Sequence, residues 1–346
     1  MKLDYAINRI HCVHPFGISR STHDYYDIVY IYIEKDGIIG KGEAAPSNRY
    51  GEHTQDIVSA LNEGIHIDER MADIDNFIQN MTPQCKNIKS LEVAISMALL
   101  DWHCQYKQLP LYKFFNASRT NTPNTSYTIS IGDMALIPEK IKESKPYKII
   151  KVKLGISKEK DKEIINSIRE YTDKPIRVDA NEGWDLDTGL EMSRWLADRN
   201  IEFIEQPFHS NNLKDTAELK KKSPLPLIAD ENSINSNDVM ALKGIFDGIN
   251  IKLMKCGNLF EAKKMIDLAR ENQMKVMIGC MIESSVAITA ASHLSPLVDF
   301  ADLDGNLLIK DDPYVGVKII DGKIILPKTN GLGVKLSKAA TNNKLK

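Results

Sequence analysis

The run Ile149-Ile150-Lys151-Val152-Lys153 is the first of five short apolar segments that end in, or are closely followed by, a charged residue. These charged residues are Lys153, Asp179, Glu205, Asp230 and Lys255, and subtraction gives steps of 26, 26, 25 and 25 residues. One strand, one helix and two short loops occupy an interval of this size. The spacing therefore predicts successive strands of a parallel barrel, each with a charged group at its carboxyl end, where barrel enzymes build their active sites.

The residues before this pattern predict a separate α+β region. Residues 3–15 and 25–34 are rich in Ile, Val and Tyr and predict two strands, and Lys35-Asp36-Gly37 predicts a hairpin turn into a third strand at 38–45. Apolar residues at helical spacing follow over 54–81 and 87–105. We expect this region to form a capping domain.

Strand–helix alternation begins after a polar linker at 118–125. Further strands are predicted at 126–131, 275–278 and 298–303, and helices at 158–171, 188–199 and 259–272. Such alternation favours a parallel sheet closed as a barrel. An open doubly wound sheet is the alternative, but no glycine-rich dinucleotide fingerprint follows any predicted strand. We expect the cap at residues 1–120, the barrel at 121–310, and a segment at 311–346 that packs back on the cap, with a polar end from Gly331 trailing over the surface.

Composition excludes several classes of function. The chain has 346 residues, a formal net charge of −2 and no long basic block, which argues against a nucleic-acid partner. Its five cysteines are scattered and lack C-x-x-C spacing, so neither a disulfide framework nor a zinc cage is predicted. No apolar run is long enough to span a bilayer and the N-terminus lacks a signal-peptide core, so we expect a cytoplasmic protein without a membrane partner.

Three carboxylates come from consecutive predicted strand ends, namely Asp179, Glu205 and Asp230. A barrel brings them together, where they repel one another unless a cation lies between them. Oxygen ligands without nearby His or Cys favour Mg²⁺ over zinc. The alternative is that each carboxylate pairs with a local lysine or arginine.

Lysines flank this group. Lys151 and Lys153 alternate along one strand and therefore share a face, and Lys255 comes from across the rim. Two lysines that face each other over a metal suggest acid/base chemistry on opposite faces of one carbon. The alternative is that they balance the charge of the carboxylates, a role open to Lys151 in particular.

Asp302 and Asp304 also alternate, so both side chains lie on one face of the last strand. Two buried like charges are costly without a cation between them. That cation is either an arginine of the protein or the ammonium group of a substrate.

These residues together resemble the enolase superfamily, muconate-lactonizing subgroup. The resemblance rests on Lys151-x-Lys153, the three carboxylates and Lys252-x-x-Lys255, with Gly42-Glu43-Ala44-Ala45-Pro46 and Leu109-Pro110-Leu111-Tyr112 in the cap. Asp302-Leu303-Asp304-Gly305 and the segment from Gly279 to Ser284, with Cys280 and Met281, are similar to the dipeptide epimerases of this subgroup. The resemblance implies a modified (β/α)7β TIM-like barrel with an N-terminal α+β capping domain.

The resemblance also implies an isomerase with one Mg²⁺ per subunit, and a homo-oligomer. Its substrate would be a dipeptide, L-Ala-L-Xaa, inverted at the α-carbon of the C-terminal residue by Lys153 and Lys255. Asp302 and Asp304 would bind the α-ammonium group, and substrate contacts would come from Thr128, Lys151, Cys280 and Met281.

Side-chain specificity is implied to depend on two loops of the cap. The loop with Arg49 resembles that of L-Ala-D/L-Glu epimerases, in which an arginine of the other loop meets the glutamate side chain. Here Arg20 is near that position and His23 aligns closest to it. This departure leaves open whether the side chain is Glu or belongs to a broader set.

The alternatives within the fold are an N-acylamino-acid racemase, an o-succinylbenzoate synthase or a cycloisomerase. Their anionic substrates lack a free ammonium group, which the Asp302/Asp304 pair disfavours. A more remote alternative is a non-catalytic barrel that binds a ligand, which a missing lysine or carboxylate would favour.

Overall fold

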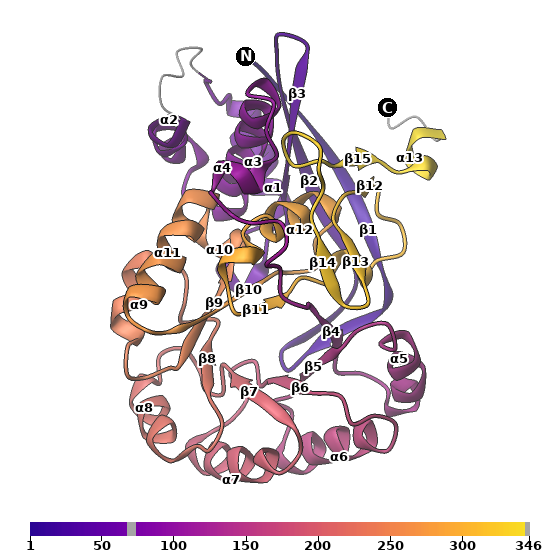
Figure 1. Ribbon diagram of the computed structural model, residues 1–346, viewed down its shortest axis with the longest axis vertical. Coiled ribbons are helices and arrows are strands. Elements are labelled where there is room, and N and C mark those ends of the chain that lie inside the picture. Colours follow the sequence, from indigo (N-terminus) through magenta and orange to yellow (C-terminus); the bar gives the residue numbers. More distant parts are fainter. Residues whose placement is uncertain (68–73, 343–346) are drawn as a thin grey trace.

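Eight parallel strands make up the barrel in the computed structural model, which describes residues 1–67 and 74–342 (Figure 1). Each strand pairs with the next along the chain, and a parallel bridge between Thr125 and Ala301 joins the last strand to the first. The strands are β4 (Ser126–Ile129), β5 (Ile149–Lys153), β6 (Ile176–Asp179), β7 (Ile201–Glu205), β8 (Leu227–Ala229), β9 (Gly248–Lys252), β10 (Lys275–Gly279) and β11 (Phe300–Asp302).

Helices follow the strands on the outside of the barrel (Figure 1). They are α5 (Ile137–Glu143), α6 (Lys158–Arg169), α7 (Leu186–Ala197), α8 (Leu213–Lys222), α9 (Ser236–Leu242), α11 (Leu259–Glu271) and α12 (Ser285–Ser292), with the short α10 (Leu253–Cys256) directly after β9. The predicted (β/α)7β barrel is therefore confirmed.

Alternation along the strands explains how the barrel carries charged groups inside. In β5, Ile150 and Val152 belong to the hydrophobic core, whereas Lys151 and Lys153 point to the opposite face and reach carboxylates of other strands. Adjacent residues of a strand face opposite sides of the sheet. The barrel wall is thus sealed by aliphatic residues, and its interior is free to hold polar chemistry.

The capping domain is an antiparallel sheet packed on helices. Its strands are β1 (Lys2–Ile18), β2 (Ser21–Lys35) and β3 (Ile38–Ala44), and its longer helices are α1 (Thr54–Glu63), α2 (Ile74–Met81) and α3 (Lys89–Tyr106). A Cβ atom on Gly40 or Gly42 would lie 1.9 or 1.8 Å from a carbonyl oxygen of α3. Glycine at these positions therefore allows β3 to pack directly against α3.

The helical pattern predicted over 54–81 is divided in the structure, because α1 ends at Glu63, Gly64 follows with a φ of 94°, and α2 spans Ile74–Met81. Residues 68–73, which fall within that prediction, lie outside the described residues. Single-turn elements are α4 (Leu111–Phe114), η1 (Asn48–Tyr50), η2 (Thr82–Cys85), η3 (Met134–Leu136), η4 (Ser295–Leu297) and η5 (Gly305–Leu307).

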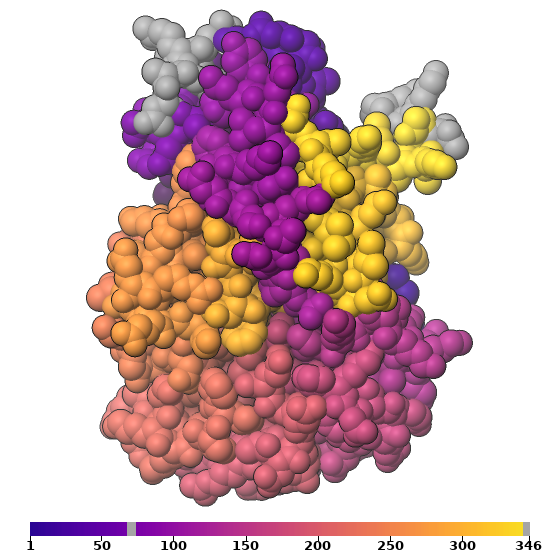
Figure 2. Space-filling model, in the orientation of Figure 1, coloured from indigo at the N-terminus to yellow at the C-terminus, as the bar shows by residue number. Residues whose placement is uncertain are grey.

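The C-terminal segment lies against both the cap and the start of the barrel. Figure 2 shows it in yellow beside purple cap residues, and bridges join Pro110 to Gly331 and Asn124 to Lys323. Its elements are β12 (Tyr314–Val315), β13 (Lys318–Ile320), β14 (Lys323–Ile325), β15 (Lys335–Leu336) and α13 (Lys338–Asn342). The prediction that the chain trails over the surface from Gly331 was wrong at its start, because Leu332 is fully buried and its N–H donates to Asp101.

The β1–β2 hairpin carries the cap to the barrel rim. The strands run side by side from the N-terminus to a turn at Ser19 and Arg20, and the N–H of Ile131, just after β4, donates to the carbonyl of Gly17. Within the described residues, the longest helices are too short or too polar to cross a bilayer.

Candidate active site

Strand ends place the predicted charged groups on one rim. Lys153, Asp179 and Glu205 are the last residues of β5, β6 and β7, and Asp230 directly follows β8. The last residue of β9 is Lys252, whereas Lys255 lies within α10. The rim lysine contributed by β9 is therefore Lys252.

The three carboxylates form a compact buried cluster. Each of Asp179, Glu205 and Asp230 offers an oxygen atom within 4.8 Å of the other two. Burial and the charge of Asp179 raise the pKa of Glu205 to about 7. Its Oε2 accepts no well-aligned hydrogen bond, although the ammonium nitrogen of Lys151 lies 2.6 Å away. Three oxygen donors at this separation fit a hard divalent cation such as Mg²⁺.

Two lysines flank the carboxylates from opposite sides. Nζ of Lys153 lies 2.7 Å from Asp179, Nζ of Lys252 lies 2.7 Å from Asp230, and both lysines line one cavity. Their strands, β5 and β9, are four positions apart in an eight-stranded barrel, so the two lysines approach the cavity from opposite walls. Burial alone would lower the pKa of Lys252, but the charges of Asp230 and Glu205 raise it above its usual range.

The assignment of Lys255 as the second acid/base residue does not fit the structure. Its Nζ donates to the carbonyl and Oδ1 of Asp230, at 2.5 and 2.6 Å, and to the carbonyl of Asn250 at 3.0 Å. These bonds occupy all three protons of the ammonium group, and Lys255 is not among the cavity-lining residues. Because α10 begins directly after β9, the side chain of Lys255 is directed into the protein interior, where it donates hydrogen bonds to Asp230 and holds this carboxylate in place.

The predicted substrate contact from Lys151 does not fit either. This side chain is fully buried, does not line the cavity, and approaches Asp302 at 2.7 Å as well as Glu205. Burial alone would lower the pKa of Lys151, but the carboxylates of Asp302, Glu205 and Asp179 raise it well above its usual range. Lys151 is thus the protein's own countercharge.

The two aspartates of the last strand have different environments. Asp302 accepts from Lys151 and from the hydroxyl of Ser126, and although burial opposes the effect, Lys151 lowers its pKa to about 2. Asp304 accepts from the backbone N–H of Thr128, and burial and Asp302 raise its pKa to about 7. Both line the cavity. No lysine or arginine of the described chain forms an ion pair with Asp304, so this is the carboxyl left open to a cationic ligand.

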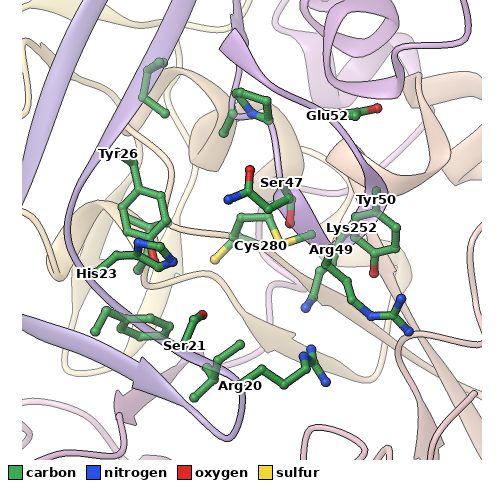
Figure 3. A pocket seen from close by; sticks show the side chains of 18 of the residues that line it. Arg20, Ser21, His23, Tyr26, Ser47, Arg49, Tyr50, Glu52, Lys252 and Cys280 are labelled. Atoms are coloured by element: carbon green, nitrogen blue, oxygen red, sulfur yellow. The ribbon is translucent and has the colours of Figure 1, made fainter.

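The cavity has a volume of about 640 Å³ and lies between the barrel rim and two loops of the cap. The predicted residues that line it include Thr128, Cys280, Met281, Arg20, His23 and Arg49. In Figure 3, Arg20 and Arg49 point to one side of the cavity, while His23 and Tyr26 occupy the other. The cap thus supplies two chemically distinct walls.

Four further residues at this site were not predicted to contribute to it. Three of them line the cavity, namely Lys252, Tyr50 and Glu231. The fourth, Glu182, forms ion pairs with both Arg20 and Arg49. Strand register would have identified Lys252, and Tyr50 directly follows Arg49 in a loop already singled out. Glu182 and Glu231 carry no motif that separates them from other glutamates of the sequence.

Two family models match this chain. Residues 5–115 match the mandelate racemase/muconate lactonizing enzyme N-terminal domain, and residues 136–340 match an enolase C-terminal domain-like model. The L-Ala-D/L-Glu epimerase of Bacteroides thetaiotaomicron is 40% identical over 341 residues, covering 96% of this chain and 88% of the relative. A hydrophobic dipeptide epimerase of Flavobacteria bacterium is 36% identical, covering 93% and 94%.

A solved structure supports the same relationship. The dipeptide epimerase of Cytophaga hutchinsonii, in complex with Mg and D-Ala-L-Val, superimposes with a TM-score of 0.90 at 31% identity and covers 99% of this chain and 97% of that one. The resemblance seen in the sequence is confirmed. The chain belongs to the mandelate racemase/muconate lactonizing enzyme group of the enolase superfamily.

Proposed function

We propose that this protein is a Mg²⁺-dependent dipeptide epimerase that inverts the α-carbon of the C-terminal residue. The observation that carries the proposal is the placement of Lys153 and Lys252 on opposite walls of one cavity. The carboxylate cluster occupies the arc of strands between them, and Asp302 and Asp304 occupy the other arc. Relatives named as dipeptide epimerases and the Mg complex from Cytophaga hutchinsonii support this proposal.

Asp179, Glu205 and Asp230 would hold the Mg²⁺. When bound, the ion supplies positive charge that stabilises the negative charge developing on the substrate carboxylate as its α-proton leaves. One lysine accepts the α-proton, and the lysine on the opposite wall donates a proton to the other face of the carbon. Epimerisation follows because the proton leaves one face and arrives on the other.

The two aspartates would orient the dipeptide. Asp304, which has no cationic partner in the described chain, accepts the α-ammonium group, and Asp302 is fixed beside it by Lys151 and Ser126. Substrates of N-acylamino-acid racemases, o-succinylbenzoate synthases and cycloisomerases lack that ammonium group. A buried carboxyl without a cation is costly, so the Asp304 position favours the dipeptide over those substrates.

Proton NMR in D₂O with enzyme, MgCl₂ and a library of L,L-dipeptides tests the proposed function. We expect the α-proton signal of the C-terminal residue to disappear while signals of the L,D-diastereomer grow. Absence of exchange across the library, with turnover of an N-succinylated amino acid, would favour a racemase instead. Absence of any turnover or Mg²⁺ binding would favour the non-catalytic barrel.

We further propose that the protein works in the reducing cytoplasm, because its five cysteines are all unpaired and four of them are buried. A homo-oligomer remains a prediction from the resemblance. Size-exclusion chromatography with light scattering would give the number of subunits.

A further inference from the structure

The two arginines of the cavity are tied to carboxylates of the barrel. Arg20, at the tip of the β1–β2 hairpin, lies 2.9 Å from Glu182 and 2.8 Å from Glu231. Arg49, from η1, lies 2.9 Å from the same Glu182. The side chains of the two glutamates are 4% and 3% exposed, so these pairs are closed to water on the barrel side. Two positive and two negative charges cancel within this group.

The barrel backbone presents these acceptors to the arginines. Asn181 and Glu182 are consecutive residues with positive φ, 45° and 66°, a conformation that side-chain-bearing residues rarely adopt. It places the carbonyl of Asn181 2.6 Å from Nη1 of Arg20, and the N–H of Ser210 holds the carboxylate of Glu182 at 2.8 Å. The ion pairs are therefore part of a contact between cap and barrel that the barrel backbone also holds in place.

The rest of the cavity lining includes an aromatic wall and several apolar residues. His23 and Tyr26 form this wall, with their rings 5.6 Å apart, and the cavity is also lined by Phe16, Ile18, Ile282 and Leu308. Figure 3 shows His23 and Tyr26 away from the guanidinium groups of Arg20 and Arg49. A side chain that reaches this wall gains apolar contact and meets no unpaired arginine.

We propose that the enzyme acts on dipeptides whose C-terminal residue has a neutral, apolar or aromatic side chain, and that Arg20 and Arg49 fasten the cap loops to the barrel instead of selecting glutamate. The inference rests on the proposed dipeptide epimerisation. A glutamate side chain that reached Arg20 would have to break a pair with a buried carboxylate or approach that carboxylate itself. Both routes carry a penalty that a neutral side chain avoids.

The matched substrates L-Ala-L-Gln and L-Ala-L-Glu test the role of charge at nearly constant shape, with L-Ala-L-Met and L-Ala-L-Phe as apolar members. We expect kcat/KM for Gln to equal or exceed that for Glu, and Met and Phe to exceed both. A preference for Glu over Gln of tenfold or more would overturn the inference and leave the epimerase function intact. Absence of turnover for all four, and for the wider library, would count against the function itself.

Variants then test the assignment of the arginines. Glu182→Gln removes one negative charge from the group, and we expect the Glu-to-Gln ratio of kcat/KM to rise at least threefold. His23→Arg adds an unpaired cation to the opposite wall without removing an ion pair, and should raise the ratio further. Glu191→Gln, which changes an exposed carboxylate on α7 that pairs with Lys158 and Lys162, should leave the ratio unchanged. An unchanged ratio in both Glu182→Gln and His23→Arg would overturn the inference; if Glu182→Gln does not fold, His23→Arg decides.

Discussion

Lys252 lies on the cavity side of Asp230, and its Nζ donates to Oδ2 of that carboxylate at a distance of 2.7 Å. On the protein side, Lys255 donates to Oδ1 of the same carboxylate. One aspartate therefore separates a lysine that lines the cavity from a lysine that does not. This arrangement assigns different roles to two lysines only three residues apart.

Replacement of either cavity lysine should abolish epimerisation but leave half of the exchange reaction. We expect Lys153→Ala and Lys252→Ala to lower kcat/KM for epimerisation by about 10³-fold, within the range of general acid–base catalysis. Each variant should still exchange the α-proton of one diastereomer, and the two should retain opposite ones. Proton NMR in D₂O, started separately from the L,L- and L,D-dipeptides, measures this. A Lys252→Ala enzyme that epimerises at the wild-type rate would refute the assignment.

Lys255→Met provides the comparison for that experiment. Loss of a buried partner should destabilise the fold by about 3–5 kcal/mol, because Asp230 is left underpaired. Any remaining exchange should fall equally for both diastereomers, since Lys255 does not face the substrate. Urea unfolding gives the stability, and the same NMR assay gives the symmetry of exchange.

Site residues that follow a local sequence pattern could be predicted, whereas contacts between distant segments could not. Strand ends repeat at a regular interval, so Lys153, Asp179, Glu205 and Asp230 could be placed on one rim without a structure. The same interval selected Lys255 because the step from Asp230 to Lys252, the end of β9, is only 22 residues, so a step of 25 falls within α10.

Contacts between distant segments could not be predicted in this way. Arg20 pairs with Glu182 and Glu231, which are 162 and 211 residues away in the sequence. Nothing in the local sequence pattern identifies these two glutamates as its partners. For the same reason, Lys151 could not be identified as the cation beside Asp302, 151 residues later. Period 2 placed each side chain on a face, but only the closed barrel determined which faces met.

Mg²⁺ should stabilise the protein through the carboxylate cluster. At an ion concentration 100 times its Kd, binding contributes about 2.7 kcal/mol, which should raise Tm by several degrees over the EDTA-treated protein. Glu205→Gln removes a ligand charge at constant shape and should abolish most of this increment. Asp267→Asn, on the exposed side of α11, should retain it. An equal Mg²⁺ increment in Glu205→Gln would place the ion elsewhere.

Asp304→Asn should weaken use of substrates with a free amino group. A hydrogen bond to a charged group contributes about 1.5–3 kcal/mol, so kcat/KM for the free dipeptide should fall roughly 10- to 100-fold. The N-acetyl dipeptide, which has no ammonium group, should be a poor substrate of both enzymes and change little. Asp311→Asn, at an exposed pair with His11, is the matched control. If the variant lowers kcat/KM for both substrates by the same factor, Asp304 does not bind the ammonium group.

His293 should make the stability of the protein fall in mild acid. Its ring is fully buried, accepts from the N–H of Tyr112 and contacts the carbonyl of Leu332, so it joins the barrel to α4 and the C-terminal segment. Burial lowers its pKa from 6.5 to about 4. Between these values the unfolded chain binds a proton that the folded protein does not, so stability is complete above pH 6.5 and decreases as the pH falls towards 4.

His293→Gln removes this titrating group, so the difference between wild type and variant reports the contribution of His293 alone to the pH dependence of stability. The wild type should lose about 2 kcal/mol more than the variant between pH 7.5 and pH 5.0. Urea unfolding of both proteins at pH 7.5, 6.0 and 5.0 measures the difference. The variant should be the less stable protein at pH 7.5, because the contacts to Tyr112 and Leu332 are weakened, and this gap should narrow as the pH decreases. A gap that is independent of pH would mean that His293 is protonated to the same extent in the folded and unfolded chains, and that its burial does not exclude the charged form.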